Sequence, residues 1–500
     1  MASITGVGLN TMLASRTISS MRDQLAELQR QLGTGKRSQT YGGLGLGSGL
    51  VLNMRSQLAR IDTFKSTISN IDLRVKLMNT SLQRIGDLRD ETRSDLFAPF
   101  DYTLVSNGQS AAQRSASSRL GEMLTLLNGD AGGRYLFSGR ATDVPSVDTY
   151  THILEGDGTR AGLKQIISER LQADQGDGYG RLTLNAAAGS VVSLEEDGAH
   201  PFGFKIAGAT TSFGATITGP GAPPATLDID LGAINPAEGA TVRVQFTLPD
   251  GSSTAIELRA TTTTPPGANQ FLIGATPGDT ATNITAALDT QIQRLARTDL
   301  AAASAIQAGN EFFAIDAANP PLRVDGPPFD SATGLIAGTP ANTVSWYTGD
   351  DAVDSARATS TGRVDDAITV DYGARANEEA IRWVVQNTAV FAAVSFTATD
   401  VDSRDRYYAL AGRVGASMDT PAGMQKIEAI QTEIAGANLS AQAAKQRLTN
   451  RAPVLQNMID SVENVSDEEI GVKMLALNTR MQASLQVTAM LSQLSLVNYI

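Results

Sequence analysis

Apolar residues recur every three or four positions at both ends of the chain. Near the N-terminus the repeat occupies two sets of positions, which are Ile18, Met21, Leu25, Leu28 and Leu32, and then Ile61, Phe64, Ile68, Ile71, Val75, Met78, Leu82 and Ile85. Near the C-terminus it returns at Ile427, Ile430, Ile434, Ala437, Ala441, Ala444 and Leu448, and beyond a break at Arg451 it continues at Leu455, Met458, Val462 and Val465. A repeat of 3.5 residues buries its apolar stripe only against another helix. The pattern therefore predicts helices at the two chain ends that pair with each other or with neighbouring molecules.

The repeats and the residues that flank them set the expected helices. They are predicted at about 15–32, 50–96, 110–128, 377–396, 404–415, 423–463 and 467–495. The helix over 50–96 would be roughly 70 Å long at 1.5 Å per residue, and Pro99 ends it. Residues 1–17 are small and polar, so we expect them to be disordered in the free chain.

The middle of the chain has a different pattern. It is rich in Gly, Thr, Ala and Pro, and between residues 145 and 340 its only lysines are Lys164 and Lys205. Alternating residues over 241–248 and 254–258 flank a Pro-Asp-Gly turn, which predicts a β-hairpin. Helical spacing returns over 280–297 and 299–313. Short strands are expected within 130–139, 344–347 and 368–372.

Together these elements predict a mainly α protein with a β-rich insert. Terminal coiled-coil segments would occupy 1–32 and 467–500, and a helical rod with short strands would occupy 33–145 and 341–466. A mixed α/β outer domain would occupy 146–340.

Composition and charge narrow the function classes. The net charge is −12, although residues 1–100 hold 13 Lys and Arg against 8 Asp and Glu. An acidic body argues against nucleic acid as the main partner. The chain has no cysteine, which excludes disulfides and a thiol nucleophile. We expect no membrane insertion and no classical signal peptide, because no apolar run reaches ~18 residues and the N-terminus lacks a basic start followed by an apolar core.

Candidate chemistry is sparse. The two histidines, His152 and His200, lie far apart in the sequence. The Gly-rich segment 33–49 follows a helix and is not continued by Lys-Ser/Thr, so it lacks the context of a phosphate loop. Asp228 and Asp230 share a strand face and could hold a cation, although a solvated strand edge explains them better. We therefore expect no catalytic, cofactor-binding or metal site.

Three short segments and the C-terminus carry a resemblance. They are Gly33-Thr34-Gly35-Lys36-Arg37, Leu82-Gln83-Arg84-Ile85, Gly133-Arg134-Tyr135-Leu136-Phe137-Ser138-Gly139, and the terminal Leu494-Ser495-Leu496-Val497-Asn498-Tyr499-Ile500. By their order and placement the chain resembles the bacterial flagellin family, and most closely its branch of hook-associated proteins that joins hook to filament. The resemblance covers about 1–145 and 365–500. Val497 stands where the family often has an aromatic residue, and GGLGLGSG replaces the Asp-Asp-Ala-Ala-Gly-like turn of flagellins.

The resemblance implies a non-enzymatic, extracellular subunit of the flagellum, exported by the flagellar type III apparatus without a cleaved signal. Its terminal helices would form the inner tube of an assembly. The expected partners are copies of itself, hook-associated protein 1 below, flagellin above, and a cytosolic export chaperone at the C-terminal helix. The predicted assembly residues are Ile18, Met21, Leu25, Leu28, Leu477, Met481, Leu485, Leu494, Leu496, Tyr499 and Ile500.

Two alternatives stay open at this point. A flagellin-type filament subunit would share the fold and the compartment but would polymerise into long filaments. An enzyme or ligand-binding module in residues 145–340, with the helices as an anchor, would require a convergent polar pocket there.

Overall fold

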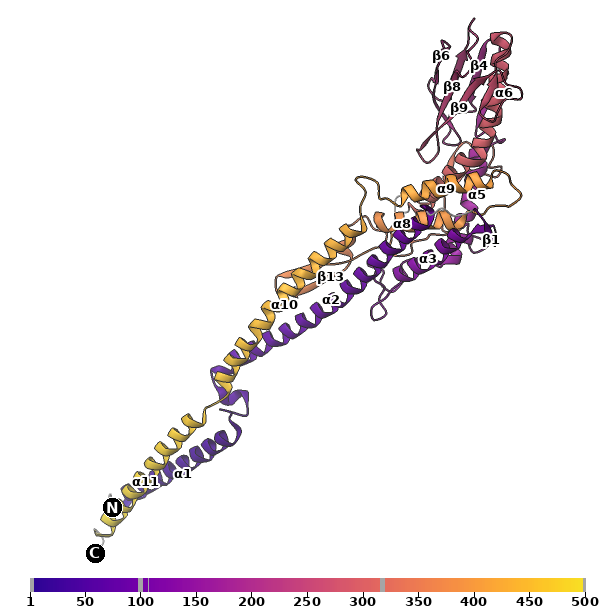
Figure 1. Cartoon of the computed structure of the whole chain (residues 1–500). Helices are drawn as coiled ribbons and strands as arrows, with labels where there is room; N and C mark the ends of the chain where they lie inside the picture. Colours follow the sequence, from indigo (N-terminus) through magenta and orange to yellow (C-terminus); the bar gives the residue numbers. More distant parts are fainter. Residues whose placement is uncertain (1–3, 98–101, 107, 315–319, 498–500) are drawn as a thin grey trace. The chain divides into compact units, whose positions relative to one another are not determined.

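The computed structural model describes residues 4–97, 102–106, 108–314 and 320–497, and for 4–11, 14, 106 and 491–497 it describes the backbone alone. About 52% of the chain is helical and a separate region is rich in sheet, which confirms the predicted mixture of α and β structure (Figure 1). The chain forms two compact units. Unit 1 comprises residues 1–71, 362–370 and 439–500, and unit 2 comprises 72–361 and 371–438.

Unit 1 is built from the two ends of the chain. Helix α1 (Ile4–Thr34) packs against helix α11 (Asp467–Val497), and Figure 1 shows the two side by side near the marked termini. A short 3-10 helix, η1 (Tyr41–Leu44), follows α1. The long helices α2 (Gly47–Phe97) and α10 (Ile427–Glu463) contribute their first and last parts to this unit and continue into unit 2.

Within unit 1, α2 and α10 run antiparallel and bury facing apolar stripes. Lys445 Nζ lies 3.3 Å from Ser69 Oγ, and Arg451 Nη2 donates to Gln57 Oε1 at 3.0 Å, so rising numbers on one helix meet falling numbers on the other. The buried residues are Val51, Met54, Ile61, Ile68 and Ile71 on α2 and Ala441, Ala444, Leu448, Leu455 and Ile459 on α10.

The predicted stripe on α10 needs one correction. Met458 is 46% exposed, and its neighbour Ile459 is buried instead. A step of four residues from Leu448 to half-buried Ala452 carries the stripe past Arg451, which is exposed. The prediction counted its register through position 451 and therefore chose Met458, two turns later, in place of Ile459.

A β-hairpin covers part of the helix pair in unit 1. Strands β13 (Thr361–Asp365) and β14 (Ile368–Asp371) bury Val364 and Val370, which confirms the strand predicted at 368–372. Arg447 of α10 lies 3.7 Å from Asp365, and Arg60 of α2 lies 3.8 Å from Asp366. The hairpin is therefore tied to both helices.

The remaining helices of the described residues belong to unit 2. They are α3 (Ala111–Leu127), α4 (Tyr150–Glu155), α5 (Leu163–Gln175), α6 (Pro277–Leu295), the π-helical turn η2 (Ala296–Leu300), α7 (Ala301–Phe313), the 3-10 helix η3 (Ala356–Thr359), α8 (Glu379–Ala393) and α9 (Ser403–Ser417). Capping boxes start two of them, with Ser110 and Gln113 at α3 and Thr276 and Asp279 at α6.

The sheet-rich region of unit 2 holds two four-stranded sheets. One has the order β10-β9-β8-β5 and the other β3-β4-β7-β6. The predicted hairpin is β8 with β9, paired antiparallel with Val244 opposite Ile256. Inward residues of both sheets share one core with Ile284, Leu288 and Ile292 of α6. The strand bounds are β3 (Leu182–Leu184), β4 (Val191–Glu196), β5 (Lys205–Thr211), β6 (Thr216–Thr218), β7 (Thr226–Asp230), β8 (Thr241–Thr247), β9 (Ser253–Thr261) and β10 (Gln270–Leu272).

Two smaller sheets complete the unit, and two predicted strands are not formed. The pairs are β1 (Leu104–Ser106) with β2 (Gln109–Ser110), and β11 (Leu322–Val324) with β12 (Leu335–Ala337). The predictions at 130–139 and 344–347 were wrong, because these segments make only isolated bridges, such as Val147 with Tyr347. Trp346 is nevertheless fully buried, and its indole donates to the Phe313 carbonyl. Burial of a bulky side chain, and not strand pairing, explains the apolar pattern there.

The helix predicted at 15–32 was too short. Helix α1 begins at Ile4, so the expected disorder of residues 1–17 is contradicted for the described residues 4–17. Packing of α1 on α11 supplies the stabilisation that the small, polar sequence does not. The predicted boundaries near 145 and 340 both lie inside unit 2, where α5 packs on α7 and α7 packs on α8 and α9. The three-part domain division remains a prediction.

A buried ion network links helices of unit 2. The guanidinium of Arg170 on α5 contacts Asp174 at 2.9 Å, Glu311 on α7, and the Pro201 carbonyl at 3.0 Å. It also stacks over the Phe202 ring, 4.9 Å from the centroid. Arg170 and Asp174 are almost fully buried. Breaking such a pair leaves an uncompensated charge in the core.

Replacing Arg170 should therefore destabilise unit 2. We expect Arg170→Leu to lower its free energy of unfolding by about 3–5 kcal/mol. Urea titration followed by tryptophan fluorescence measures this unit selectively, because Trp346 and Trp383 both belong to it. The control is Lys164→Leu, whose pair with Glu155 is exposed and should cost at most about 1 kcal/mol. Equal losses in the two variants would show that the buried network contributes no more than an exposed ion pair.

Glu311 should make the stability of unit 2 depend on pH. Burial raises the pKa of Glu311 above its ordinary value of 4.5, so between pH 4.5 and the raised pKa the folded state holds a proton that the unfolded chain has released. The stability that this bound proton adds to the folded state is complete below pH 4.5, and it is lost as the pH rises through the pKa of Glu311 in the folded state. As the pH rises from 4.5, the unfolding free energy of the wild type should therefore fall relative to that of Glu311→Gln, which has no proton to lose at this position. A difference that does not change with pH would contradict this.

Candidate functional site: the paired terminal helices

The seam between α1 and α11 contains most of the predicted assembly residues that the structure describes. Ile18, Met21, Leu25 and Leu28 are half-buried on α1. The matching residues on α11 step by three and four positions and are Ile470, Met474, Leu477, Met481, Ser484 and Thr488. Ile470 and Leu477 are buried, and Met474 and Met481 are half-buried. Two helices alone leave the edges of such a seam open to solvent, which explains the partial burial.

The remaining predicted residues near the C-terminus divide into two groups. Leu485 is 50% exposed, because the seam passes through Ser484 and leaves Leu485 beside it. In the single chain Leu485 therefore lies outside the contact with α1, and its predicted role in assembly remains a prediction. The side chains of Leu494 and Leu496 lie outside the described residues, as do Tyr499 and Ile500 entirely.

Helix α11 has a second apolar face that the sequence analysis did not identify. Its members are exposed, and they are Val472, Leu475, Ala483, Val487 and Met490. Met490 lies nine residues after Met481, which places it about 180° around the helix. Leu475 is 72% exposed and Met490 is 61% exposed. The sequence does carry a signal for this second face, because apolar residues of α11 are spread around the helix and leave no continuous polar face. A helix of this kind is normally covered on all sides.

Charged side chains line the edges of the helix pair. Glu27 accepts hydrogen bonds from Arg30 and Gln31 on α1, and these bonds lower its pKa to about 2. Glu469 pairs with Lys473 on α11, and the ammonium group lowers the pKa of Glu469. These carboxylates stay ionised at neutral pH, so the edges keep a fixed charge pattern beside the apolar residues.

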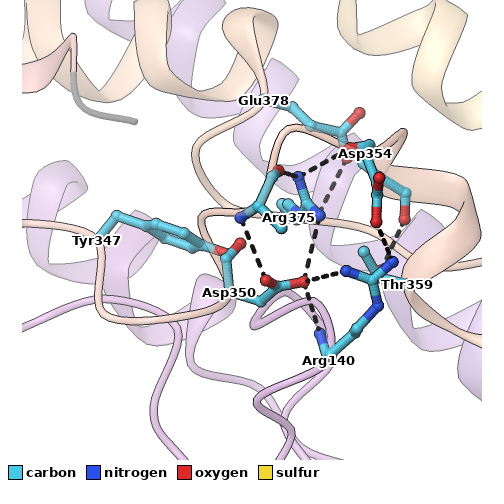
Figure 2. Close-up of polar contacts among 9 residues, drawn as sticks. Arg140, Tyr347, Asp350, Asp354, Thr359, Arg375 and Glu378 are labelled. Carbon is cyan, nitrogen blue, oxygen red and sulfur yellow. Dashed lines mark hydrogen bonds and ion pairs between the residues drawn. The ribbon is translucent and has the colours of Figure 1, made fainter. Parts of the chain in front are cut away.

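A polar cluster in unit 2 brings two arginines, two aspartates and a tyrosine together (Figure 2). Arg375 contacts Asp350 at 3.2 Å and donates to the carbonyls of Ala352 and Asp354. Arg140 also reaches Asp350, at 3.5 Å, and contacts Asp354. Burial alone would raise the pKa of Asp350, but the Ala352 amide and the Arg375 charge outweigh it and lower the pKa.

The phenol in this cluster is not a base. Tyr347 donates to the Asp350 carbonyl at 3.0 Å, and burial raises the pKa of Tyr347. It therefore stays protonated at neutral pH. The charges of the cluster neutralise one another and hold the loop 350–354 against Arg140 and Arg375. This arrangement explains the cluster as structural.

The two histidines lie in separate surroundings. His152 Nδ1 lies 2.9 Å from Asp148. His200 is buried, contacts Asp197 at 2.6 Å and Arg181 at 3.0 Å, and has its pKa lowered by burial. The carboxylate of Asp230 accepts from Ser190 and from the Gly232 amide. Among the described residues, no group of three or more His, Cys, Asp or Glu side chains is placed to hold a metal ion.

One hollow of unit 2 bears on the ligand-binding alternative. It has a volume of about 520 Å³ and lies between β9, α6 and α9. Arg294 and Asp405 in its lining pair with each other at 2.5 Å.

Within the described part of the chain, no helix is long and apolar enough to cross a membrane.

Comparison of the chain with protein-family models gives no match, and comparison with curated proteins gives none either. The assignment of a function therefore depends on the residues and their geometry.

A charge in the seam should separate the terminal helices. We expect Leu25→Asp to raise amide hydrogen exchange throughout α1 and α11, because a carboxylate on this stripe loses its hydration without gaining a partner. The tryptophan-detected unfolding of unit 2 should stay unchanged. Leu13→Asp is the control, since Leu13 is exposed on the same helix. Equal exchange in both variants would show that the seam does not hold the pair.

Proposed function

We propose that this chain is a structural subunit of the bacterial flagellum that forms the junction between hook and filament. The observation that supports it best is the second apolar face of α11. In the single chain α1 covers the seam, but Val472, Leu475, Val487 and Met490 remain in water. The flagellin-like motifs near residues 33–37 and 133–139 and at the C-terminus point in the same direction.

The energy available from this face is large compared with ordinary surface contacts. Burying an aliphatic side chain contributes roughly 1.5–3 kcal/mol, so four of them outweigh several exposed ion pairs. A face on the side of α11 opposite its seam cannot be covered by α1. Neighbouring subunits would cover it, in a head-to-tail contact that repeats along a tube or ring.

The proposed partners follow from this role. Copies of the chain would pack through the terminal helices, with hook-associated protein 1 below and flagellin above. An export chaperone would cover the C-terminal helix before the chain leaves the cell, and the mature subunit would be extracellular. The paired charges of the Arg375 cluster and of the hollow beside Arg294 favour this structural role over an enzyme.

A charge on the second apolar face should prevent assembly and leave the monomer intact. We expect Val487→Asp to abolish assembly, because Val487 is 55% exposed in the monomer but would be buried between subunits. Asn478→Asp is the matched control, since it adds the same charge at another exposed position of α11. Sedimentation measures assembly, and circular dichroism checks the fold. Normal assembly of the Val487 variant would refute this use of the face.

Seeded growth separates the junction subunit from a filament subunit. Purified protein is added to sheared flagellar filament fragments and examined by electron microscopy. A junction subunit should add only short extensions or caps at the fragment ends. Long filaments would instead make the chain a flagellin-type filament subunit, which is the alternative that the same apolar face would also serve.

A further inference from the structure

The Gly-rich segment after α1 is held firmly in unit 1. The Arg55 guanidinium of α2 binds both carboxylate oxygens of Glu463 on α10, at 2.6 and 2.7 Å. It also donates to the Tyr41 hydroxyl at 3.0 Å and lies over the Tyr41 ring. The Arg37 amide donates to the Glu463 carbonyl at 2.7 Å. Residues 36–41 are therefore fixed to the end of α10.

The turn between this fixed segment and α2 presents one apolar side chain entirely to water. Gly45 takes a left-handed conformation, with φ of 58°, and its carbonyl accepts from the Ser48 amide and hydroxyl as α2 begins. The turn leaves Leu46 fully exposed, with Leu50 half exposed one turn further along α2. An anchored loop keeps its apolar tip in place without a further loss of chain entropy on binding.

A groove of suitable character lies on the α1–α11 pair. Its volume is about 660 Å³, and its apolar lining residues are Leu28, Ala476 and Leu477. The lining also includes two acidic residues of α1, Asp23 and Glu27, and two basic residues of α11, Lys473 and Arg480. This lining is continuous with the second apolar face of α11, since Ala476 follows Leu475 and lies one turn after Val472.

We propose that Leu46 of one copy inserts into this groove on the next copy, an inference that rests on the proposed function. Leu46 is fully exposed in the single chain, so its own groove does not hold it. Charge is compatible with this contact. No acidic residue lies between Glu27 and Asp62, so the segment that leads to Leu46 carries Lys36 and Arg37, which can face Asp23 and Glu27 in the lining of the groove. A projection on one surface that fits a depression on another gives a head-to-tail contact that can repeat.

Cross-linking between two single-cysteine variants tests the contact, and the absence of native cysteine makes the result unambiguous. Leu46→Cys protein is mixed with Ala476→Cys protein, assembled on filament fragments and oxidised. The control mixture uses Leu73→Cys, because Leu73 is exposed on the same helix α2. We expect a disulfide-linked heterodimer on a non-reducing gel from the first mixture and none from the second.

The other outcomes are distinguishable. Assembly without the heterodimer would overturn the Leu46 contact and leave the proposed function standing. Heterodimers from both mixtures would also overturn the contact, since they would show random encounter. If the wild-type chain fails to assemble on the fragments, the proposed function falls and the contact falls with it. As a second variant, Leu46→Glu should reduce the assembled fraction, whereas Leu73→Glu should leave it unchanged.

Discussion

The structure depends on the pairing of helices that lie hundreds of residues apart in the sequence. Arg55 and Glu463, which form the ion pair at the end of the α2–α10 pair, are separated by 408 positions. Closing a loop of that length in a disordered chain costs roughly 5 kcal/mol on the (3/2)RT ln n scale. Unit 2 removes most of this cost, because it places Asn438 Nδ2 within 3.1 Å of Asp72 and Gln431 near Asn79. The helices that enter unit 1 therefore leave unit 2 as neighbours.

The two units are stabilised in different ways, and the difference matches their proposed roles. Unit 2 has a closed core in which sheets and α6 share apolar contacts and Arg170 has both its carboxylate partners. Unit 1 has a two-helix seam at its end, with most seam residues only half-buried. A closed core supports a monomer, whereas an open seam beside a second apolar face leaves stabilisation to be gained from further subunits.

Charge in this protein is used mainly to fix segments of the chain. Arg375, Arg140 and Arg170 each bind carboxylates that come from other elements, and the pKa of Asp350 is lowered as a result. The Arg55–Glu463 pair does the same for the segment that carries Leu46. In each case the ion pair holds a segment of the chain in position. This use of charge is consistent with a subunit that presents surfaces to partners.

The sequence by itself determined where the long helices lie and most of their pairing stripes, because a 3.5-residue apolar repeat is a local signal that permits few alternatives. It also identified the β8–β9 hairpin, where alternation flanks a Pro-Asp-Gly turn, and Ile18, Met21, Leu25, Leu28, Leu477 and Met481 of the seam. Only the tertiary structure decided that Leu485 lies beside the seam, that Ile459 replaces Met458, and that Trp346 is buried without a strand. Register and burial depend on which surface lies opposite a residue. That surface comes from distant parts of the chain, which a local pattern cannot specify.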